Sequence, residues 1–292
     1  MAANMPPAEV VVTPALVRSL LSDQRPDLAD RDISLLAHGW DNETFRVGDD
    51  LVARMPRRDM AAGLVENEAR WLPLLASRLT VPVSAPSFLG EPGHGYPWRW
   101  VLVPWIPGES AALSEIDHDH VAVALAEFLR CLHVPAPADA PVNPFRSTPL
   151  QVRDEAARSR IQLLSDEMDT ERVTGIWDES LGLPEHAGPK VWLHGDLHPH
   201  NILVIDGRLS AVIDFGDICR GDPAIDLAIG WTLFPSDARR RFREHYGGDE
   251  ALWGRARGWA LHYALSFLAN SADNPTMARL GAIGVNRLLE ED

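Results

Sequence analysis

Three polar side chains in the second half of the chain have the types and spacing that metal-assisted group transfer needs. Asp196 and Asn201 lie in the segment HGDLHPHN, and Asp214 follows in IDFGD. Mg²⁺ prefers oxygen ligands and binds well to one carboxylate, one amide oxygen and the phosphate oxygens of a substrate. Asn201 and Asp214 could supply these two protein ligands, while Asp196 could accept or orient the proton of a hydroxyl nucleophile.

Short strands predicted around these residues indicate where the three side chains lie relative to one another. The runs Val191–Leu193, Ile202–Ile205 and Leu209–Ile213 are typical of strands, and Asp206-Gly207 between the last two is a strong hairpin turn signal. A hairpin closed by this turn predicts three cross-strand pairs, Ile205 with Arg208, Leu203 with Ser210 and Asn201 with Val212. In this register Asn201 and Asp214 lie at the end of the hairpin that the loop carrying Asp196 enters.

The order Asp-x-x-x-x-Asn followed by Asp-Phe-Gly is the order of the catalytic and metal-binding segments in kinases. The segments HGDLHPHN, IDFGD and GDPAIDLA, between Val191 and Ala228, closely resemble the aminoglycoside phosphotransferase family of small-molecule kinases. A zinc site built from the His and Asp residues of the loop is an alternative, but it leaves Asn201 and Asp214 unexplained.

The resemblance implies an α+β, two-lobed, protein-kinase-like fold. Residues 1–107 would form a small N-terminal nucleotide-binding lobe with an antiparallel sheet, and residues 108–292 a larger, mainly helical lobe with the catalytic loop and the acceptor site. The sequence pattern agrees, because strand-like runs near Ile33–Ala37, Thr44–Val47, Leu51–Met55, Ser87–Leu89 and Trp98–Val103 precede a proline-rich connection at Pro104–Gly108.

The resemblance also implies roles for individual residues. Asp196 would deprotonate the acceptor hydroxyl, and Asn201 and Asp214 would hold Mg²⁺. The hinge backbone, including Val103 and Trp105, would receive the purine of ATP or GTP.

Arg54 stands where the family has a lysine that holds the nucleotide phosphates, which is a departure from the pattern. Glu68 falls on the apolar face of a helix predicted over Met60–Leu79, and a carboxylate in such a place needs a partner. We therefore predict an Arg54–Glu68 ion pair at the nucleotide site. A surface arginine and a solvated glutamate are the alternatives.

The remainder of the chain is predicted to be mainly helical. Helices over Leu150–Met168 and Glu171–Leu181 carry many acids, and the resemblance makes them the wall of the acceptor pocket. Asp222-Pro223 begins another helix, through about Phe234. Within it Asp226 matches a family aspartate that braces the catalytic loop from behind.

The composition excludes several classes of partner. The chain has 292 residues, 42 acidic and 27 basic residues and a formal charge of −15, which argues against nucleic-acid and anionic-membrane partners and suits a cationic small molecule; plain solubility is the alternative explanation. Cys131 and Cys219 form no metal or disulfide pattern, and neither a signal peptide nor an apolar run long enough to span a bilayer is evident. We expect a cytoplasmic protein.

These observations predict an enzyme that uses Mg²⁺ and transfers the γ-phosphoryl group of ATP or GTP to a hydroxyl of a small molecule. The first candidate for this acceptor is an aminoglycoside antibiotic. A macrolide phosphotransferase and a kinase of a small metabolite are the alternatives within this class. A non-catalytic nucleotide-binding pseudokinase is the alternative outside it, supported by Arg54 alone.

Overall fold

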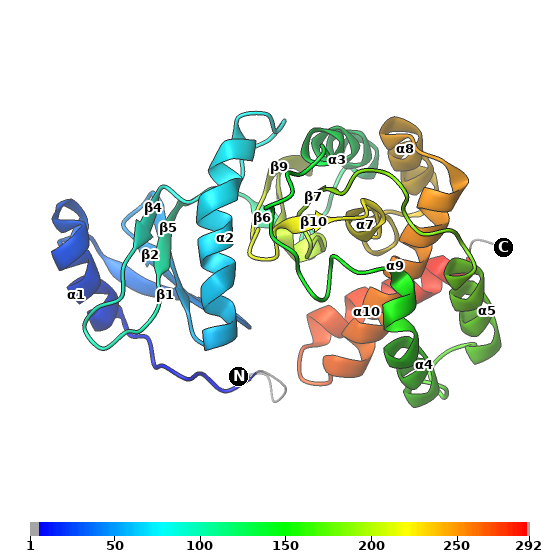
Figure 1. Cartoon of the computed structure of the whole chain (residues 1–292), viewed down its shortest axis with the longest axis horizontal. Helices are drawn as coiled ribbons and strands as arrows, with labels where there is room; N and C mark the ends of the chain where they lie inside the picture. Colours follow the sequence, from blue (N-terminus) through cyan, green and yellow to red (C-terminus); the bar gives the residue numbers. More distant parts are fainter. Residues whose placement is uncertain (1–5, 291–292) are drawn as a thin grey trace. The chain divides into compact units, whose positions relative to one another are not determined.

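The computed structural model describes residues 6–290, and the chain divides into two compact units (Figure 1). The first unit comprises the described residues up to Arg78, together with Pro82–Pro107 and Ile213–Ile218. The second comprises Leu79–Val81, Gly108–Val212 and the described residues from Cys219 onward.

The first unit is a five-stranded antiparallel sheet with a helix on each face (Figure 1). Its strand order is β1-β2-β3-β5-β4. The elements are α1 (Pro14–Gln24), η1 (Pro26–Leu28), β1 (Ile33–His38), β2 (Asn42–Val47), β3 (Leu51–Pro56), α2 (Asp59–Ala76), β4 (Phe88–Gly90) and β5 (Trp100–Pro104).

Side-chain alternation along the central strands gives the sheet two buried faces. Ala53 and Met55 of β3 join Trp100 and Leu102 of β5 in a cluster that includes α1. On the opposite face, Val52, Val101 and Val103 pack with Val65 of α2. Arg54 alternates with Ala53 and so shares the α2 face with Val52.

The second unit is mainly helical and contains two small sheets, ordered β6-β8-β9 and β10-β7. Its elements are β6 (Glu109–Ser110), α3 (His118–Leu132), η2 (Leu150–Arg153), α4 (Asp154–Leu163), α5 (Thr170–Leu181), β7 (Val191–Leu193), η3 (Pro199–Asn201), β8 (Ile202–Ile205), β9 (Arg208–Val212), β10 (Cys219–Gly221), α6 (Ala224–Leu227), α7 (Ile229–Leu233), α8 (Ser236–Tyr246), α9 (Glu250–Asn270) and α10 (Pro275–Leu289).

Helix α9 is the centre of this unit, because α4, α5, α6, α7 and α10 all contact it. Close packing depends on small residues along it. A Cβ atom at Gly258 would lie 2.4 Å from Leu150 Cδ2 and 2.6 Å from Ser180 Cβ, so any larger residue would push η2 and α5 away. None of the described helices is long and apolar enough to cross a membrane.

The predicted hairpin is present, with one correction to its register. Asp206 and Gly207 both have positive φ angles, 50° and 72°, as a two-residue type I′ turn requires. Ile205 pairs with Arg208 as predicted, but Val204 pairs with Leu209 and Leu203 with Ala211. Ser210 is the extra residue of a β-bulge, and the predicted Leu203–Ser210 and Asn201–Val212 pairs are therefore wrong.

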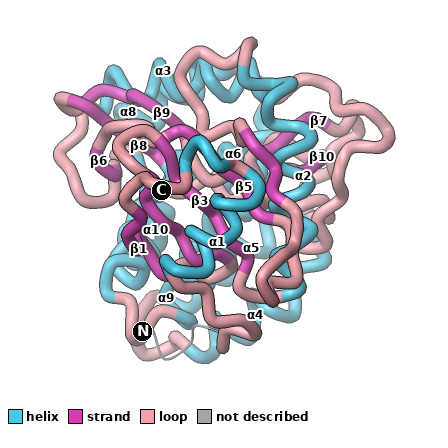
Figure 2. Tube along the Cα trace, turned by 90° about the vertical axis from the view of Figure 1, so that its left-hand side faces the viewer, coloured by secondary structure: helices cyan, strands magenta, loops and turns pink. Residues whose placement is uncertain are grey.

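The bulge lies where a third strand joins the hairpin. Ser110 of β6 pairs with Leu203 on the other edge of β8, and Figure 2 shows β6, β8 and β9 side by side. Gly108, just before β6, leaves room only for a hydrogen, because a Cβ atom there would lie 3.0 Å from both Leu203 Cβ and Ser210 Oγ. With the bulge, Ile202 faces Val212, and Asn201 directly precedes the first pair.

Two predicted helices are shorter or interrupted. The helix predicted over Leu150–Met168 begins with the 3₁₀ turn η2, and its α-helical part, α4, ends at Leu163. The helix predicted from Asp222 to Phe234 is divided into α6 and α7. The N–H of Trp231 bonds to the carbonyl of Ala228, three residues back, so the junction is wound more tightly than an α-helix.

Candidate active site

In the first unit, Arg54 lies between two carboxylates. Its Nη1 atom is 2.7 Å from both oxygens of Glu68, and its Nη2 atom is 2.6 Å from Asp214 Oδ1. Glu68 is fully buried and Arg54 is 7% exposed. The predicted Arg54–Glu68 ion pair is confirmed, and the surface-arginine and solvated-glutamate alternatives are wrong.

The charges of this group depend on one another. Burial raises the pKa of the Glu68 carboxyl, while the charge of Arg54 opposes that rise. Burial would lower the pKa of Arg54, but Glu68 and Asp214 outweigh it and hold the guanidinium firmly protonated, with its pKa above the ordinary value. The ion pair therefore ties β3 to α2 and fixes the direction of the guanidinium.

Asp214 has an unusual backbone for a residue other than glycine. Its φ angle is 63°, in the left-handed region, and its N–H donates to Ser84 Oγ at 3.3 Å. Such conformations are costly and tend to occur at functional sites. About half of the side chain, 52%, is exposed to solvent, so a cation can reach the carboxylate.

In the second unit, the loop after β7 is held by a buried aspartate. Asp226 accepts hydrogen bonds from the N–H groups of His194, at 2.7 Å, and Gly195, at 3.0 Å. Its third partner is His133 Nε2, at 3.1 Å. The bracing role predicted for Asp226 is confirmed.

These contacts also fix the charge of Asp226. Burial would raise its pKa, but the hydrogen bond and charge of His133, with help from His194, outweigh burial and hold the pKa below its ordinary value. An ionised carboxylate thus anchors the backbone of the two residues that directly precede Asp196.

Asp196 lies on the loop that Asp226 holds in place. Arg146 Nη2 lies 2.9 Å from Asp196 Oδ1, and His198 Nε2 lies 3.6 Å from Oδ2. Its side chain is 37% exposed. Burial of the carboxyl would raise its pKa, but His198, Arg146 and His194 outweigh that effect and hold the pKa well below its usual range. Asp196 is therefore ionised at neutral pH and can receive a proton.

Asn201 is buried at the end of the same loop. Its Nδ2 atom donates to the carbonyl of Asp196 at 2.9 Å. This hydrogen bond uses the donor end of the amide, so Oδ1 is the atom that a cation would take. This hydrogen bond fixes the predicted metal ligand to the backbone of Asp196.

Each of the two residues predicted to bind Mg²⁺ offers an oxygen of a suitable kind. Asp214 offers a half-exposed carboxylate and Asn201 an amide oxygen, which are hard ligands of the kind that Mg²⁺ combines with phosphate oxygens and water. In the described part of the chain, no three His, Cys, Asp or Glu side chains come together as a metal site. A bound Mg²⁺ would neutralise negative charge on the phosphates.

The hinge residues have well-defined contacts within the first unit. Val103 pairs with Val52 across β5 and β3, and its side chain is buried. The N–H of Trp105 donates to the carbonyl of Asp50 at 2.8 Å, and its ring lies 3.9 Å from the Arg46 guanidinium carbon. The Trp105 N–H is thus engaged within its own unit, and purine binding at Val103 and Trp105 stays a prediction.

Sequence reasoning missed two features of the second unit. The first is Arg146, whose place in a proline-rich segment gave no sign of its contact with Asp196.

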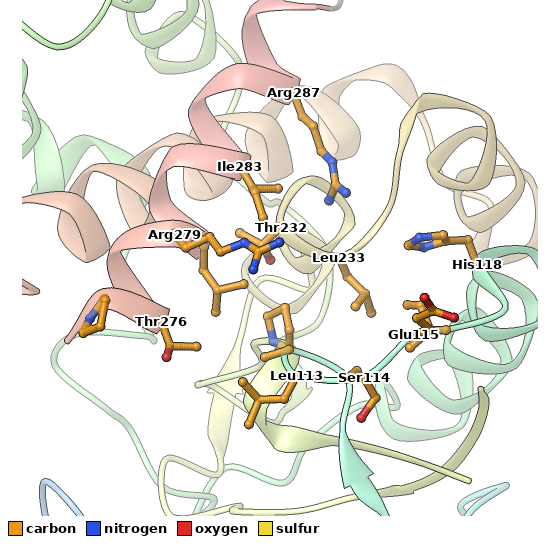
Figure 3. A pocket seen from close by; sticks show the side chains of 16 residues that line it. Leu113, Ser114, Glu115, His118, Thr232, Leu233, Thr276, Arg279, Ile283 and Arg287 are labelled. Atoms are coloured by element: carbon orange, nitrogen blue, oxygen red, sulfur yellow. The ribbon is translucent and has the colours of Figure 1, made fainter. Parts of the chain in front are cut away.

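The second is a cavity of about 600 Å³ that includes Pro199 but none of the predicted site side chains (Figure 3). Arg279, Ile283 and Arg287 of α10 all line this cavity. Their four-residue spacing on one helix face was the signal available in the sequence.

Sequence comparisons find a matching family and a related protein. The family described as "Phosphotransferase enzyme family" matches residues 32–259, more than half of the chain. An aminoglycoside 3'-phosphotransferase from Escherichia coli is 28% identical over 202 residues, which cover 65% of this chain and 72% of that protein.

Solved structures share the fold. The GDP and kanamycin complex of APH(2'')-IIIa superposes with a TM-score of 0.70 at 20% identity, covering 94% of this chain and 99% of the other. The macrolide 2'-phosphotransferase MphH from Brachybacterium faecium gives a TM-score of 0.60 at 21% identity, covering 94% and 97%. At these identities the likeness establishes the predicted two-lobed α+β, kinase-like fold. Together with the match over residues 32–259, it identifies the chain as a member of the phosphotransferase enzyme family, and hence as a phosphotransferase.

Proposed function

We propose that this phosphotransferase moves the γ-phosphoryl group of ATP or GTP to a hydroxyl group of a small molecule. The observation that carries the proposal is Asp196, a partly exposed and ionised carboxylate on a loop whose backbone is fixed by Asp226. A general base of this kind has to be ionised and well placed before the acceptor arrives.

In the reaction, the acceptor oxygen forms a bond to the γ-phosphorus, and the bond from that phosphorus to the β–γ bridging oxygen breaks. The bridging oxygen leaves with the electron pair on the nucleoside diphosphate, and Asp196 takes the hydroxyl proton. Because the pKa of Asp196 is low, proton transfer becomes favourable only as the new bond forms. This timing suits the loose transition state of phosphoryl transfer.

The other residues bind and orient. Arg54, fixed by Glu68, would hold the nontransferred phosphates, and Asn201 and Asp214 would hold Mg²⁺. Residues 1–107 would serve as the nucleotide-binding lobe, with Val103 and Trp105 at the purine, and residues 108–292 as the lobe for catalysis and the acceptor.

Aminoglycosides are the first acceptors to test, because one relative is named an aminoglycoside phosphotransferase and a structure with the same fold contains kanamycin. Macrolides are the second class, because a macrolide kinase shares the fold. The test is nucleotide turnover, measured by coupled release of ADP or GDP, against both antibiotic classes and hydroxylated metabolites. Acceptor-dependent turnover supports the proposal. Nucleotide binding without any turnover would instead identify a pseudokinase.

Salt dependence discriminates between the antibiotic classes. If a polycationic aminoglycoside is attracted by the net charge of −15, its KM should rise steeply with salt, because the Debye length falls from ~10 Å at 0.1 M to ~3 Å at 1 M. A macrolide bound mainly by apolar burial should respond weakly. A KM for the aminoglycoside that stays flat with salt would contradict attraction by net charge.

A further inference from the structure

The charges of three arginines in the second unit act on one buried histidine. Arg146 follows a proline-rich loop, Arg153 ends η2 and Arg160 lies near the end of α4. His262, on α9, is 7% exposed, and burial together with the charges of all three arginines lowers its pKa. The elements that carry Arg153 and Arg160, η2 and α4, both pack against α9. We call these four side chains the arginine cluster.

The cluster is connected to the catalytic loop. Arg146 contacts Asp196 at 2.9 Å, and its guanidinium carbon lies 5.1 Å from the centre of the Tyr263 ring. Tyr263 follows His262 on α9 and stacks with Phe267, which in turn meets His198 edge to face. An anion that contacts Arg146 would therefore lie beside Asp196.

The charges of Arg153 and Arg160 are poorly balanced. Arg153 donates to the carbonyl of Pro144 at 2.7 Å and to Thr148 Oγ1 at 3.0 Å, which are both uncharged. Arg160 Nη1 is buried and has no hydrogen-bond partner. In the part of the chain that the structure describes, neither Arg153 nor Arg160 forms an ion pair with a carboxylate.

This imbalance opposes folding. Burial and the charge of Arg146 lower the pKa of Arg153, and burial and the charge of Arg153 lower the pKa of Arg160. Buried donors and charges are costly unless they are paired. Elsewhere in the same unit a buried arginine is paired, since Arg255 Nε lies 2.7 Å from Asp222 Oδ2.

A bound anion would supply the missing acceptor oxygens. Guanidinium groups bind planar carboxylates and phosphates through parallel hydrogen bonds. We infer that the arginine cluster binds an anionic group of the acceptor, a carboxylate or a phosphate, and so presents a hydroxyl of the same molecule to Asp196. The inference rests on the proposed function, and it names a different acceptor class from the one that net charge favours.

The first experiment measures anion binding directly. Inorganic phosphate is titrated into the full chain at constant ionic strength, with saturating ADP and Mg²⁺ present to occupy the nucleotide site. We expect phosphate to bind, and Arg160→Gln to raise its Kd about tenfold or more, which corresponds to losing one charge-assisted hydrogen bond. Arg160→Lys, which keeps the charge, should lie between the two.

Two control variants remove the same charge at other places. Arg158→Gln is on α4 as well, but Arg158 pairs with Asp154 and Asp178, so phosphate binding should be unchanged. Arg279→Gln removes an arginine of the cavity in Figure 3. If Arg279→Gln abolishes phosphate binding while Arg160→Gln does not, or if ADP alone prevents binding, the inference is overturned.

The second experiment compares turnover of matched acceptors, glucose with glucuronate and with glucose 1-phosphate, alongside kanamycin. The charged member of each pair should have the lower KM, and Arg160→Gln should raise that KM about tenfold with little change in kcat. Kanamycin as the best acceptor, with a KM unaffected by Arg160→Gln, would overturn the inference while leaving the proposed function intact. No turnover with any acceptor would count against the proposed function, and the phosphate titration would still decide the inference.

Discussion

The two arginine-containing groups of this protein differ in how their charges are balanced. In the first unit one guanidinium, Arg54, contacts two carboxylates, Glu68 and Asp214. In the arginine cluster of the second unit, Arg146 contacts the carboxylate of Asp196, while Arg153 and Arg160 form no ion pair with a carboxylate among the described residues. The first group has an excess of negative charge, which suits a cation, and the second contains two guanidiniums without a carboxylate partner, which suits an anion. The preference of each site is set locally, and a net charge of −15 predicts neither.

The largest expected effect comes from a change at Asp196, the proposed general base, which contacts Arg146 of the arginine cluster. Asp196→Asn should lower kcat by roughly 10² to 10⁴, the range for loss of a general base, while nucleotide binding stays nearly intact. Steady-state kinetics and a nucleotide titration measure the two quantities. Near-normal kcat in this variant would show that Asp196 only pairs with Arg146.

Breaking the ion pair between Arg54 and Glu68 should reduce the stability of the folded protein. Arg54→Ala leaves Glu68 buried without its partner and should lower the free energy of unfolding by about 3 to 5 kcal/mol at pH 8. Burial raises the pKa of Glu68, so in the variant the folded state binds a proton more tightly than the unfolded state does. The loss should therefore shrink as the pH falls toward 5.

Denaturant unfolding at the two pH values measures this change. Arg54→Lys is the matched control, because it keeps the charge and should retain part of the stability and activity. Equal stability of wild type and Arg54→Ala at pH 8 would contradict a structural role for the ion pair.

The free energy of unfolding should depend on pH through His262 of the arginine cluster. Burial and the three arginine charges lower the pKa of His262 to about 3, below its ordinary value of 6.5. A histidine whose pKa is lowered in the folded state favours folding fully above pH 6.5, and this contribution is lost as the pH falls from 6.5 to about 3. At pH 5 the loss is about 2 kcal/mol.

His262→Gln removes this titration and should flatten the unfolding free energy between pH 7 and pH 5. Saturating phosphate should reduce the same slope in the wild type, because a bound anion offsets the arginine charges. A slope that is identical in wild type and His262→Gln would show that His262 does not remain neutral in the folded chain.

The smallest expected effect distinguishes the two groups most directly. Arg160→Gln removes a partly buried charge without a carboxylate partner, so it should raise the free energy of unfolding by about 0.5 kcal/mol, in contrast to the loss in Arg54→Ala. Phosphate should stabilise the wild type more than this variant. Thermal unfolding with and without phosphate tests both statements, and a destabilised Arg160→Gln would mean that the cluster is balanced after all.

Local pattern determined much of this protein. The Asp206-Gly207 turn, the alternation along β3 and the helical face that carries Glu68 are set by residues close in sequence, and they predicted the hairpin and the Arg54–Glu68 pair. The spacing of Asp196, Asn201 and Asp214 is also local, and it predicted the family through its motif. Periodicity of 2 or 3.6 residues is enough to place such side chains on a face.

Tertiary structure decided what periodicity does not encode. The bulge at Ser210 arises where β6 joins the hairpin, and the Arg146–Asp196 contact joins segments 50 residues apart. The four-residue spacing of Arg279, Ile283 and Arg287 predicts a shared face, but the cavity exists only because distant segments close it. Such long-range contacts depend on how whole elements pack, so the sequence by itself determined which groups could do the chemistry, and packing decided which charges surround them.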